Sequence, residues 1–330
     1  MRRREFVTAA AGAVLAAPLV AHAQTRASPP VIGFLGIAAQ SNHVFDVEAF
    51  RLGLQQLGYV DDQTIAIEEG YADGSVERFH VLLDGVLRGG VDVLVVPGLA
   101  AALAIRERAP QTPVVAVGLP STVIYPDLFA SLHRPGGSVT GFSHFGEDLA
   151  EKRVELLREI MPALTTVAIL HNSVDPLYRA WGEKTEQAAL RQGLQAVRLG
   201  LAKPSTAELG AAMQSAGAAG AQGLIVVRDF LTHTLQDEIV RAANERHMGT
   251  MAEQRIFVEA GGLMCYGASF PDLFRRAATY VDQILKGAQP GEMPIQLATE
   301  FELVVNQRTA QALALTIPPA ILLRADEVIE

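Results

Sequence analysis

Runs of apolar residues alternate with amphipathic stretches along the first third of the chain. Four runs, rich in β-branched residues and closed by small or polar ones, are typical of buried strands: 31–37, 64–70, 91–98 and 113–118. After the first run, Phe50, Leu54 and Leu57 recur at helical spacing, and Gly58 ends that helix. The alternation of strand and helix predicts a parallel sheet with helices on both faces.

The same pattern restarts in the second half of the chain. Strand-like runs begin at 166, 195, 222 and 249, each about 130 residues after its counterpart, as in an internal structural repeat. We therefore predict an α/β fold of two lobes with parallel sheets, joined by a multi-segment hinge. Lobe one is expected to hold 31–140 and about 267–298, and lobe two 141–266 and about 299–330.

The first 23 residues have the pattern of an export signal. Three arginines follow Met1, and the apolar run 7–20 is too short to remain in a bilayer as a spanning helix. Small residues precede the bond between Ala23 and Gln24, where a signal peptidase would cut. The paired arginines favour the twin-arginine route, and the general secretory route is the alternative. We expect a soluble periplasmic protein that begins with a linker, 24–30.

Composition narrows the class of partner. Hydrophobic residues make up 49% of the 330 residues and charged residues 19%, which is a globular balance. The formal net charge of −9 disfavours nucleic acid and anionic lipid as partners. A single cysteine, Cys265, excludes an internal disulfide.

Motifs for catalysis and for cofactors are missing from the sequence. It has no phosphate-binding GxxxxGK[ST] loop, no GxGxxG dinucleotide fingerprint, no GxSxG elbow and no HExxH zinc motif. We therefore predict no catalytic residue, no metal site, no cofactor and no enzymatic activity. Cys265 lies in the stretch "GGLMCYG", where no neighbouring base would form a thiolate. Its neighbour Tyr266 is the better candidate, as a hinge residue that faces a ligand.

Candidate binding residues follow from the predicted topology, because ligands of parallel α/β sheets bind beyond the carboxyl ends of the strands. Two facing lobes would bring these ends to one cleft. The residues there are Ala38, Gln40, Ser41, Gly98, Leu99 and Gly118 in lobe one, and Ser143, His144, His171, Asn172, Asp229 and Glu253 in lobe two. Helix N-termini suit a carboxylate, and Asp229 or Glu253 suits an ammonium group, so an amino acid would fit.

Structural roles compete with these assignments. The segment 172–175 is equally typical of a helix cap, and Asp229 could cap the helix that follows it. His144 and His171 fit structural positions at loop ends, and Tyr178 fits packing better than a ligand wall.

Several segments, taken together, resemble substrate-binding proteins of ABC transporters of the tryptophan/tyrosine-uptake-like family. The resemblance covers essentially the whole chain after the export signal. The segments are "VIGFLG", "AFRLGLQQLGYVDDQTIAIE", "ASLHRPGGSVTGFS", "EKRVELLREIMP", "AEQRIFVEAGGLMCYGAS" and "TEFELVVNQRTAQALALTIPPAILLRADEVIE". The resemblance implies a type I periplasmic binding protein fold with two Rossmann-like lobes, a three-segment hinge and a small ligand in the cleft. It also implies an ABC permease and its ATPase subunit as partners.

Two segments at the inferred cleft depart from the family pattern. Pro97-Gly98-Leu99-Ala100 stands where relatives often carry a serine or threonine run, and His171-Asn172-Ser173 where they often carry Asn-Pro. Leu99 indicates a less polar ligand.

The leading interpretation is a monomeric receptor that closes on a small ligand, an amino acid or an aromatic or other small organic acid, for import. A sensory module of the same fold for a membrane signalling protein is the alternative. A periplasmic enzyme that uses Cys265 or a histidine is a weaker one.

The export signal gives a first test. The mature protein should begin near Gln24, because the cleavage pattern ends at Ala23. N-terminal sequencing or intact mass of the exported form measures this, and an intact Met1 would contradict it.

Overall fold

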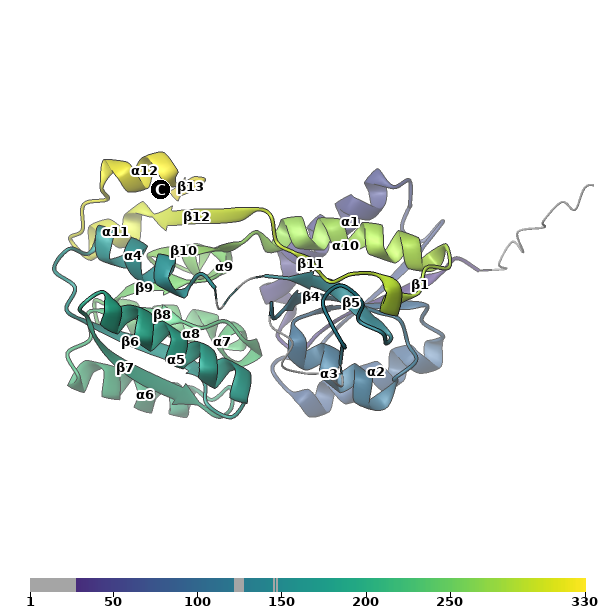
Figure 1. Cartoon of the computed structure of the whole chain (residues 1–330), viewed down its shortest axis with the longest axis horizontal. Helices are drawn as coiled ribbons and strands as arrows, with labels where there is room; N and C mark the ends of the chain where they lie inside the picture. The colour runs from purple at the N-terminus through teal and green to yellow at the C-terminus, as the bar shows by residue number, and fades with distance from the viewer. Residues whose placement is uncertain (1–27, 122–127, 145, 147) are drawn as a thin grey trace, which may run out of the picture.

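The computed structural model describes residues 28–121, 128–144, 146 and 148–330, so the predicted export signal lies outside the described residues. Two lobes lie side by side along the longest axis, and the C-terminus lies on lobe two (Figure 1). Each lobe is built on one sheet, with helices on both faces. The predicted α/β fold of two parallel-sheet lobes is confirmed.

Lobe one contains a sheet of six described strands in the order β11-β5-β4-β3-β1-β2, all parallel. The strands are β1 (Val31–Gly36), β2 (Ala66–Tyr71), β3 (Val93–Pro97), β4 (Val114–Leu119), β5 (Val139–Ser143) and β11 (Gln296–Leu297). The helices are η1 (Gln40–His43), α1 (Val44–Gln56), α2 (Val76–Gly89), α3 (Leu99–Arg108), α10 (Phe270–Leu285) and η2 (Pro290–Glu292).

Lobe two contains a sheet of seven described strands in the order β13-β12-β10-β9-β8-β6-β7. The strands are β6 (Thr166–Asn172), β7 (Gln195–Leu201), β8 (Gly223–Val226), β9 (Gly249–Ala252), β10 (Met264–Ala268), β12 (Phe301–Asn306) and β13 (Glu327–Ile329). The helices are α4 (Ala150–Ile160), α5 (Pro176–Arg191), α6 (Thr206–Ala218), α7 (Phe230–Thr234), α8 (Gln236–Asn244), α9 (Arg255–Glu259), α11 (Gln307–Ala312) and α12 (Pro319–Arg324). The pair of β10 and β12 is antiparallel, because β12 enters the lobe from the opposite side.

Short polar residues begin several of the helices that follow strands. The side chains of Ser75, Asp175 and Ser205 accept hydrogen bonds from the first-turn N–H groups of α2, α5 and α6. At the other end of α2, Gly90 takes the left-handed conformation, with φ of 86°, that stops the helix. These local signals fix where each helix leaves its strand.

The core of each lobe lies on the two faces of its sheet. In lobe one, α1 and α10 pack on one face, and α2 and α3 on the other. In lobe two, Cys265 is fully buried among the residues under α8 and α9. Burial raises the pKa of this thiol, so Cys265 is a neutral packing residue at physiological pH.

The described chain passes between the lobes at three places (Figure 1). These lie between β5 and α4, between β10 and α10, and between β11 and β12. The second passage returns α10 to lobe one, where it packs along α1. Lobe one therefore includes segments that follow most of lobe two in the sequence.

The contact of α1 with α10 depends on a glycine. A β-carbon at Gly53 would lie 2.3 Å from the carbonyl oxygen of Arg275 and 2.8 Å from the β-carbon of Ala278. Gly53→Ala should therefore destabilise the protein by about 1–3 kcal/mol in urea unfolding, because the helices must separate. Gly85→Ala in α2 is the matched control, since its β-carbon would meet open space and should be neutral or stabilising. Equal stability of the two variants would contradict this account of the helix contact.

Candidate functional site

The carboxyl ends of the strands in both lobes border a small cavity between the lobes. Lobe one contributes side chains after β1 and β3, and lobe two contributes side chains after β8 and from α5. The residues that line it include Ala38, His43, Gly98 and Leu99 from lobe one, and Tyr178, Arg228, Asp229 and His233 from lobe two. Its volume of about 20 Å³ has room for one water molecule, so the cleft is closed.

Direct contacts between the lobes maintain this closure. The side-chain amide of Asn42 donates a hydrogen bond of 2.8 Å to the carbonyl of His233. The imidazole rings of His43 and His233 lie 5.1 Å apart. Leu99 of lobe one also belongs to one continuous apolar cluster with Tyr178 of lobe two. The two faces therefore meet as a packed interface.

The predicted residues fall into two groups relative to this cavity. Ala38, Gly98, Leu99 and Asp229 line it. The other residues lie elsewhere in the structure or serve neighbouring contacts: Gln40, Ser41, Gly118, Ser143, His144, His171, Asn172, Glu253 and Tyr266. Gln40 and Ser41 are exposed, and the next two residues of η1, Asn42 and His43, make the contacts with lobe two.

Asp229 is the N-cap of α7. Its Oδ1 accepts a 3.0 Å hydrogen bond from the backbone N–H of Thr232, and its Oδ2 accepts one of 2.6 Å from the side-chain amide of Asn172. Burial raises the pKa of Asp229 to about 6 despite these donors. Both carboxylate oxygens are therefore engaged within lobe two, and Asn172 supports Asp229 directly.

Glu253 belongs to a buried cluster at the hinge. Its Oε1 accepts from the backbone N–H of Arg228 at 3.2 Å, and its Oε2 lies 3.3 Å from Nη2 of Arg153. Arg153 also donates to the carbonyls of Gly146 and Tyr266, at 2.6 and 2.7 Å. The cluster thus ties the passage between β5 and α4, at Gly146, to β10 of lobe two. The half-buried ring of Tyr266 packs against the lobe-two core.

His144 occupies the same region in its neutral form. Its ring lies 5.6 Å from Trp181 and 5.7 Å from Phe270, and its Nδ1 donates to the carbonyl of Leu119 at 3.1 Å. Burial, with a smaller effect from the positive charge of Arg228, lowers the pKa of His144 from 6.5 to about 3. Glu253, 3.6 Å away, does not reverse this shift, because its charge is shared with Arg153.

The remaining predicted positions have structural surroundings. His171 is buried, and its Nδ1 lies 3.4 Å from the carbonyl of Ile169. Ser143 is fully buried and its carbonyl accepts from Ala298, which pairs β5 with the chain beside β11. Gly118 faces Phe270 and Arg228, and a β-carbon there would lie 3.0 and 3.2 Å from them.

Arg228 is the residue that sequence reasoning missed. It lies two residues after the end of β8, is 5% exposed and lines the cavity. Its guanidinium carbon lies 4.2 Å from the centre of the Phe270 ring, which belongs to lobe one. Its position one residue before Asp229, at a strand end, was the signal available in the sequence. Burial lowers its pKa, and the nearby acidic groups do not offset this effect.

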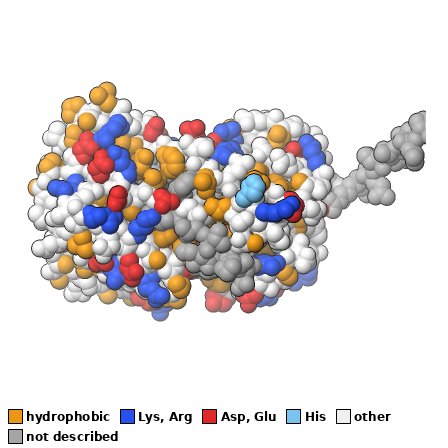
Figure 2. Space-filling model, viewed as in Figure 1, with side chains coloured by type: hydrophobic (Ala, Val, Ile, Leu, Met, Phe, Trp, Pro, Cys, Tyr) orange, Lys and Arg blue, Asp and Glu red, His pale blue; other side chains and the backbone are white. Residues whose placement is uncertain are grey.

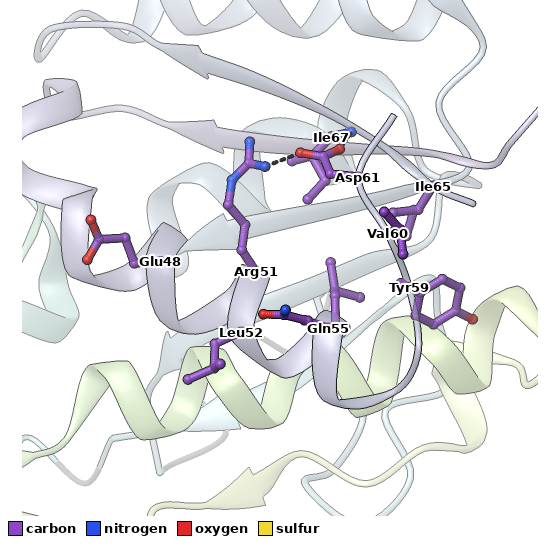
Figure 3. A pocket seen from close by; sticks show the side chains of 10 residues that line it. Glu48, Arg51, Leu52, Gln55, Tyr59, Val60, Asp61, Ile65 and Ile67 are labelled. Atoms are coloured by element: carbon purple, nitrogen blue, oxygen red, sulfur yellow. Dashed lines mark hydrogen bonds and ion pairs between the residues drawn. The ribbon is translucent and has the colours of Figure 1, made fainter. Parts of the chain in front are cut away.

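A larger cavity lies on the outer side of lobe one, between α1 and β2 (Figure 3). Its volume is about 480 Å³, and Arg51 on its wall points toward Asp61 and is ion-paired with it. All its lining residues come from lobe one, so a ligand there would not contact lobe two. The cavity between the lobes is therefore the candidate site.

Two parallel-sheet lobes, three connecting passages and a cavity at the facing strand ends define a type I periplasmic binding protein. The chain matches the family described as ABC transporter substrate binding protein over residues 41–329 and belongs to that family.

Several known proteins are similar to this chain. A tyrosine-binding protein of Clostridioides difficile is 22% identical over 266 residues, which cover 81% of this chain and 75% of the relative. A conserved domain protein from Vibrio cholerae has a TM-score of 0.82 at 23% identity, over 91% of this chain and 100% of that one. An ABC domain from Streptococcus pneumonia, solved with L-Trp, has a TM-score of 0.81 at 24% identity, over 92% and 100%. These structures share the fold.

The described residues lack two further features. Among these residues, no group of three or more histidine, cysteine, aspartate and glutamate residues is arranged to hold a metal ion. No helix in the same part of the chain has the length and apolar character needed to cross a membrane.

Because folded His144 is neutral, the stability of the protein should depend on pH. The unfolded chain takes up a proton below about pH 6.5, whereas folded His144 resists protonation until about pH 3, so its contribution to stability is lost as pH falls. Between pH 6.5 and about 4.5, the wild type should lose about 2 kcal/mol relative to His144→Gln in urea unfolding. His247→Asn, which changes an exposed histidine, is the control, and its stability should vary with pH as that of the wild type does. A constant difference between wild type and His144→Gln would refute the assignment.

Proposed function

We propose that this protein is an exported receptor that binds one small ligand between its lobes and delivers it to an ABC importer. The cavity lined from both lobes carries the proposal, because a ligand there can contact both lobes only when they are closed. Membership of the ABC transporter substrate-binding family supports it. The chemistry required is binding, since no bond of the ligand needs to change.

Closure is the mechanism by which the receptor signals occupancy. Moving such an equilibrium from mostly open to mostly closed requires about 5.5 kcal/mol of differential binding. Ala38, Gly98 and Leu99 on one side and Asp229 on the other would supply contacts that exist only in the closed form. The Glu253 cluster would anchor one of the passages about which the lobes rotate, at Gly146.

The ligand class proposed is an amino acid or an aromatic or other small organic acid. The relatives whose names include tyrosine and L-Trp support a ligand of this size. Tyr178 and Phe230 on the lobe-two wall, with Leu99 opposite, would contact an apolar part of such a ligand.

We place the receptor in the periplasm as a monomer, after removal of the signal near Ala23. Its partners would be an ABC permease and the associated ATPase subunit. The described surface agrees with a protein that carries no nucleic acid, because acidic and basic side chains are interspersed over both lobes on the visible face (Figure 2).

Calorimetric titration with amino acids, aromatic acids and small organic anions tests the proposal. We expect one ligand per chain, and a ligand at 100 times its dissociation constant should stabilise the protein by about 2.7 kcal/mol. Ala100→Trp should abolish binding, because Ala100 lines the small cavity and the indole would fill it.

Leu52→Trp is the matched control, because Leu52 is 47% exposed and lines the outer cavity of lobe one. This variant should bind as the wild type does. Binding that survives Ala100→Trp and is lost in Leu52→Trp would place the site in the outer cavity of lobe one and contradict the proposal.

A further inference from the structure

Arg228 is a buried cation that forms no ion pair within 4 Å with an acidic side chain of the described residues. Its Nε is buried and has no hydrogen-bond partner among the described residues. Its close contact is the face of Phe270, at 4.2 Å, which attracts a cation but accepts no N–H hydrogen bond of normal strength. A buried guanidinium without an anion is unfavourable, because it has lost its hydration.

The acidic groups around Arg228 are committed to other partners. The two oxygens of Asp229 accept from Thr232 and Asn172. Oε2 of Glu253 faces Arg153, and Oδ2 of Asp46 lies 3.2 Å from Nδ1 of His43. These groups reduce the repulsion felt by a cation at this place, and the cavity keeps an unmet requirement for an anion.

A second positive feature faces Arg228 from the opposite lobe. The ten-residue helix α3 begins at the cavity, its N-cap Gly98 provides no side-chain hydrogen bond, and its first turn has no acidic residue. The N-terminus of a helix carries a partial positive charge and free N–H groups. Nη1 of Arg228 lies 4.0 Å from the place that a β-carbon of Gly98 would take, so the guanidinium is close to this end of α3.

We propose that Arg228 and the N-terminus of α3 bind the carboxylate of the ligand between them. This inference rests on the proposed receptor function and narrows it to a small organic acid that has no α-amino group. Leu99, Tyr178 and Phe230 receive the apolar part of that acid. An ammonium group is disfavoured, because Asp229 is already satisfied and no other acidic side chain among the described residues lines the cavity.

The same arrangement couples binding to closure. Without an anion, closure brings the guanidinium and the positive end of α3 together, and the two repel each other. A carboxylate between them turns this repulsion into charge-assisted hydrogen bonds from both lobes. Since the closed cavity holds about one water molecule, the acid enters while the lobes are apart.

The test uses matched probes on the mature protein. Calorimetry would compare 3-phenylpropionate, L-phenylalanine, phenethylamine and 3-phenylpropanamide, which share an apolar part and differ in charge. Acetate, butyrate and benzoate extend the acid series to other sizes. We expect at least one acid without an amino group to bind, and to bind at least 10-fold more tightly than its amine, amide or amino-acid counterpart.

Arg228→Gln should weaken binding of that acid at least 100-fold, whereas Arg228→Lys should recover part of the loss. Arg276→Gln is the matched control, because Arg276 also lies over an aromatic ring, Phe142 at 5.1 Å, but does not line the cavity. It should bind within about twofold of the wild type. Ligand-free Arg228→Gln should unfold at a higher urea concentration than the wild type, because an unmatched buried charge is removed.

Three results would overturn the inference. One is failure of every acid to bind. Another is an acid that binds Arg228→Gln as well as the wild type, and the third is tighter binding of an amine or amino acid. An amino acid that binds one to one and is blocked by Ala100→Trp would overturn the restriction to acids without an amino group. A sugar that behaves in this way would overturn the carboxylate assignment. Either result would leave the receptor function standing.

Discussion

The facing carboxyl ends of two parallel sheets are the constraint on which the rest of this structure depends. Each strand that reaches this edge places its next residues at the surface between the lobes. Polar side chains there are removed from water when the lobes meet, so each needs a partner. Asp229 accepts hydrogen bonds from Asn172 and Thr232, and Glu253 forms an ion pair with Arg153. Nε of Arg228 has no hydrogen-bond partner among the described residues. Ring nitrogens of His43 and His233 on the same cavity also lack a partner among the described residues, and Arg228 is the cation of this group, with a place for an anion beside it.

Lobe architecture could be read from the sequence because it depends on local pattern. Valine-rich runs, such as VLVVP in β3, are typical of strands buried on both faces of a sheet, and Ser75 and Gly90 fix the ends of α2. The antiparallel direction of β12 could not be read, because strand direction depends on the path of the chain between lobes. The same holds for the pairing of α10 with α1 across more than 200 residues of sequence.

The site was predictable in position but less so in detail. Strand ends led to Gly98, Leu99 and Asp229, which line the cavity. Because the chain turns in η1, Asn42 and His43 face lobe two, and Gln40 and Ser41 are exposed to solvent. Arg228 was not singled out, because an arginine is usually a solvated residue and its burial depends on contact with the other lobe.

The hinge and the binding surface use buried charge in different ways. Arg153 and Glu253 balance each other, and their hydrogen bonds tie the passage at Gly146 to the end of β8 and to β10 in lobe two. Arg228 lies against Phe270 of the other lobe and forms no ion pair with a described acidic side chain. In the proposed receptor, the carboxylate of the ligand would supply the missing charge.

The most direct test of this account is mass spectrometry of what the protein selects from a mixture. Mature protein would be incubated with an equimolar pool of amino acids, organic acids, amines and sugars, washed and denatured, and the released molecules identified. The account predicts that one carboxylic acid without an amino group is recovered from the wild type and is absent from Arg228→Gln. Recovery of an amine or a sugar, or of the same acid from both proteins, would contradict it.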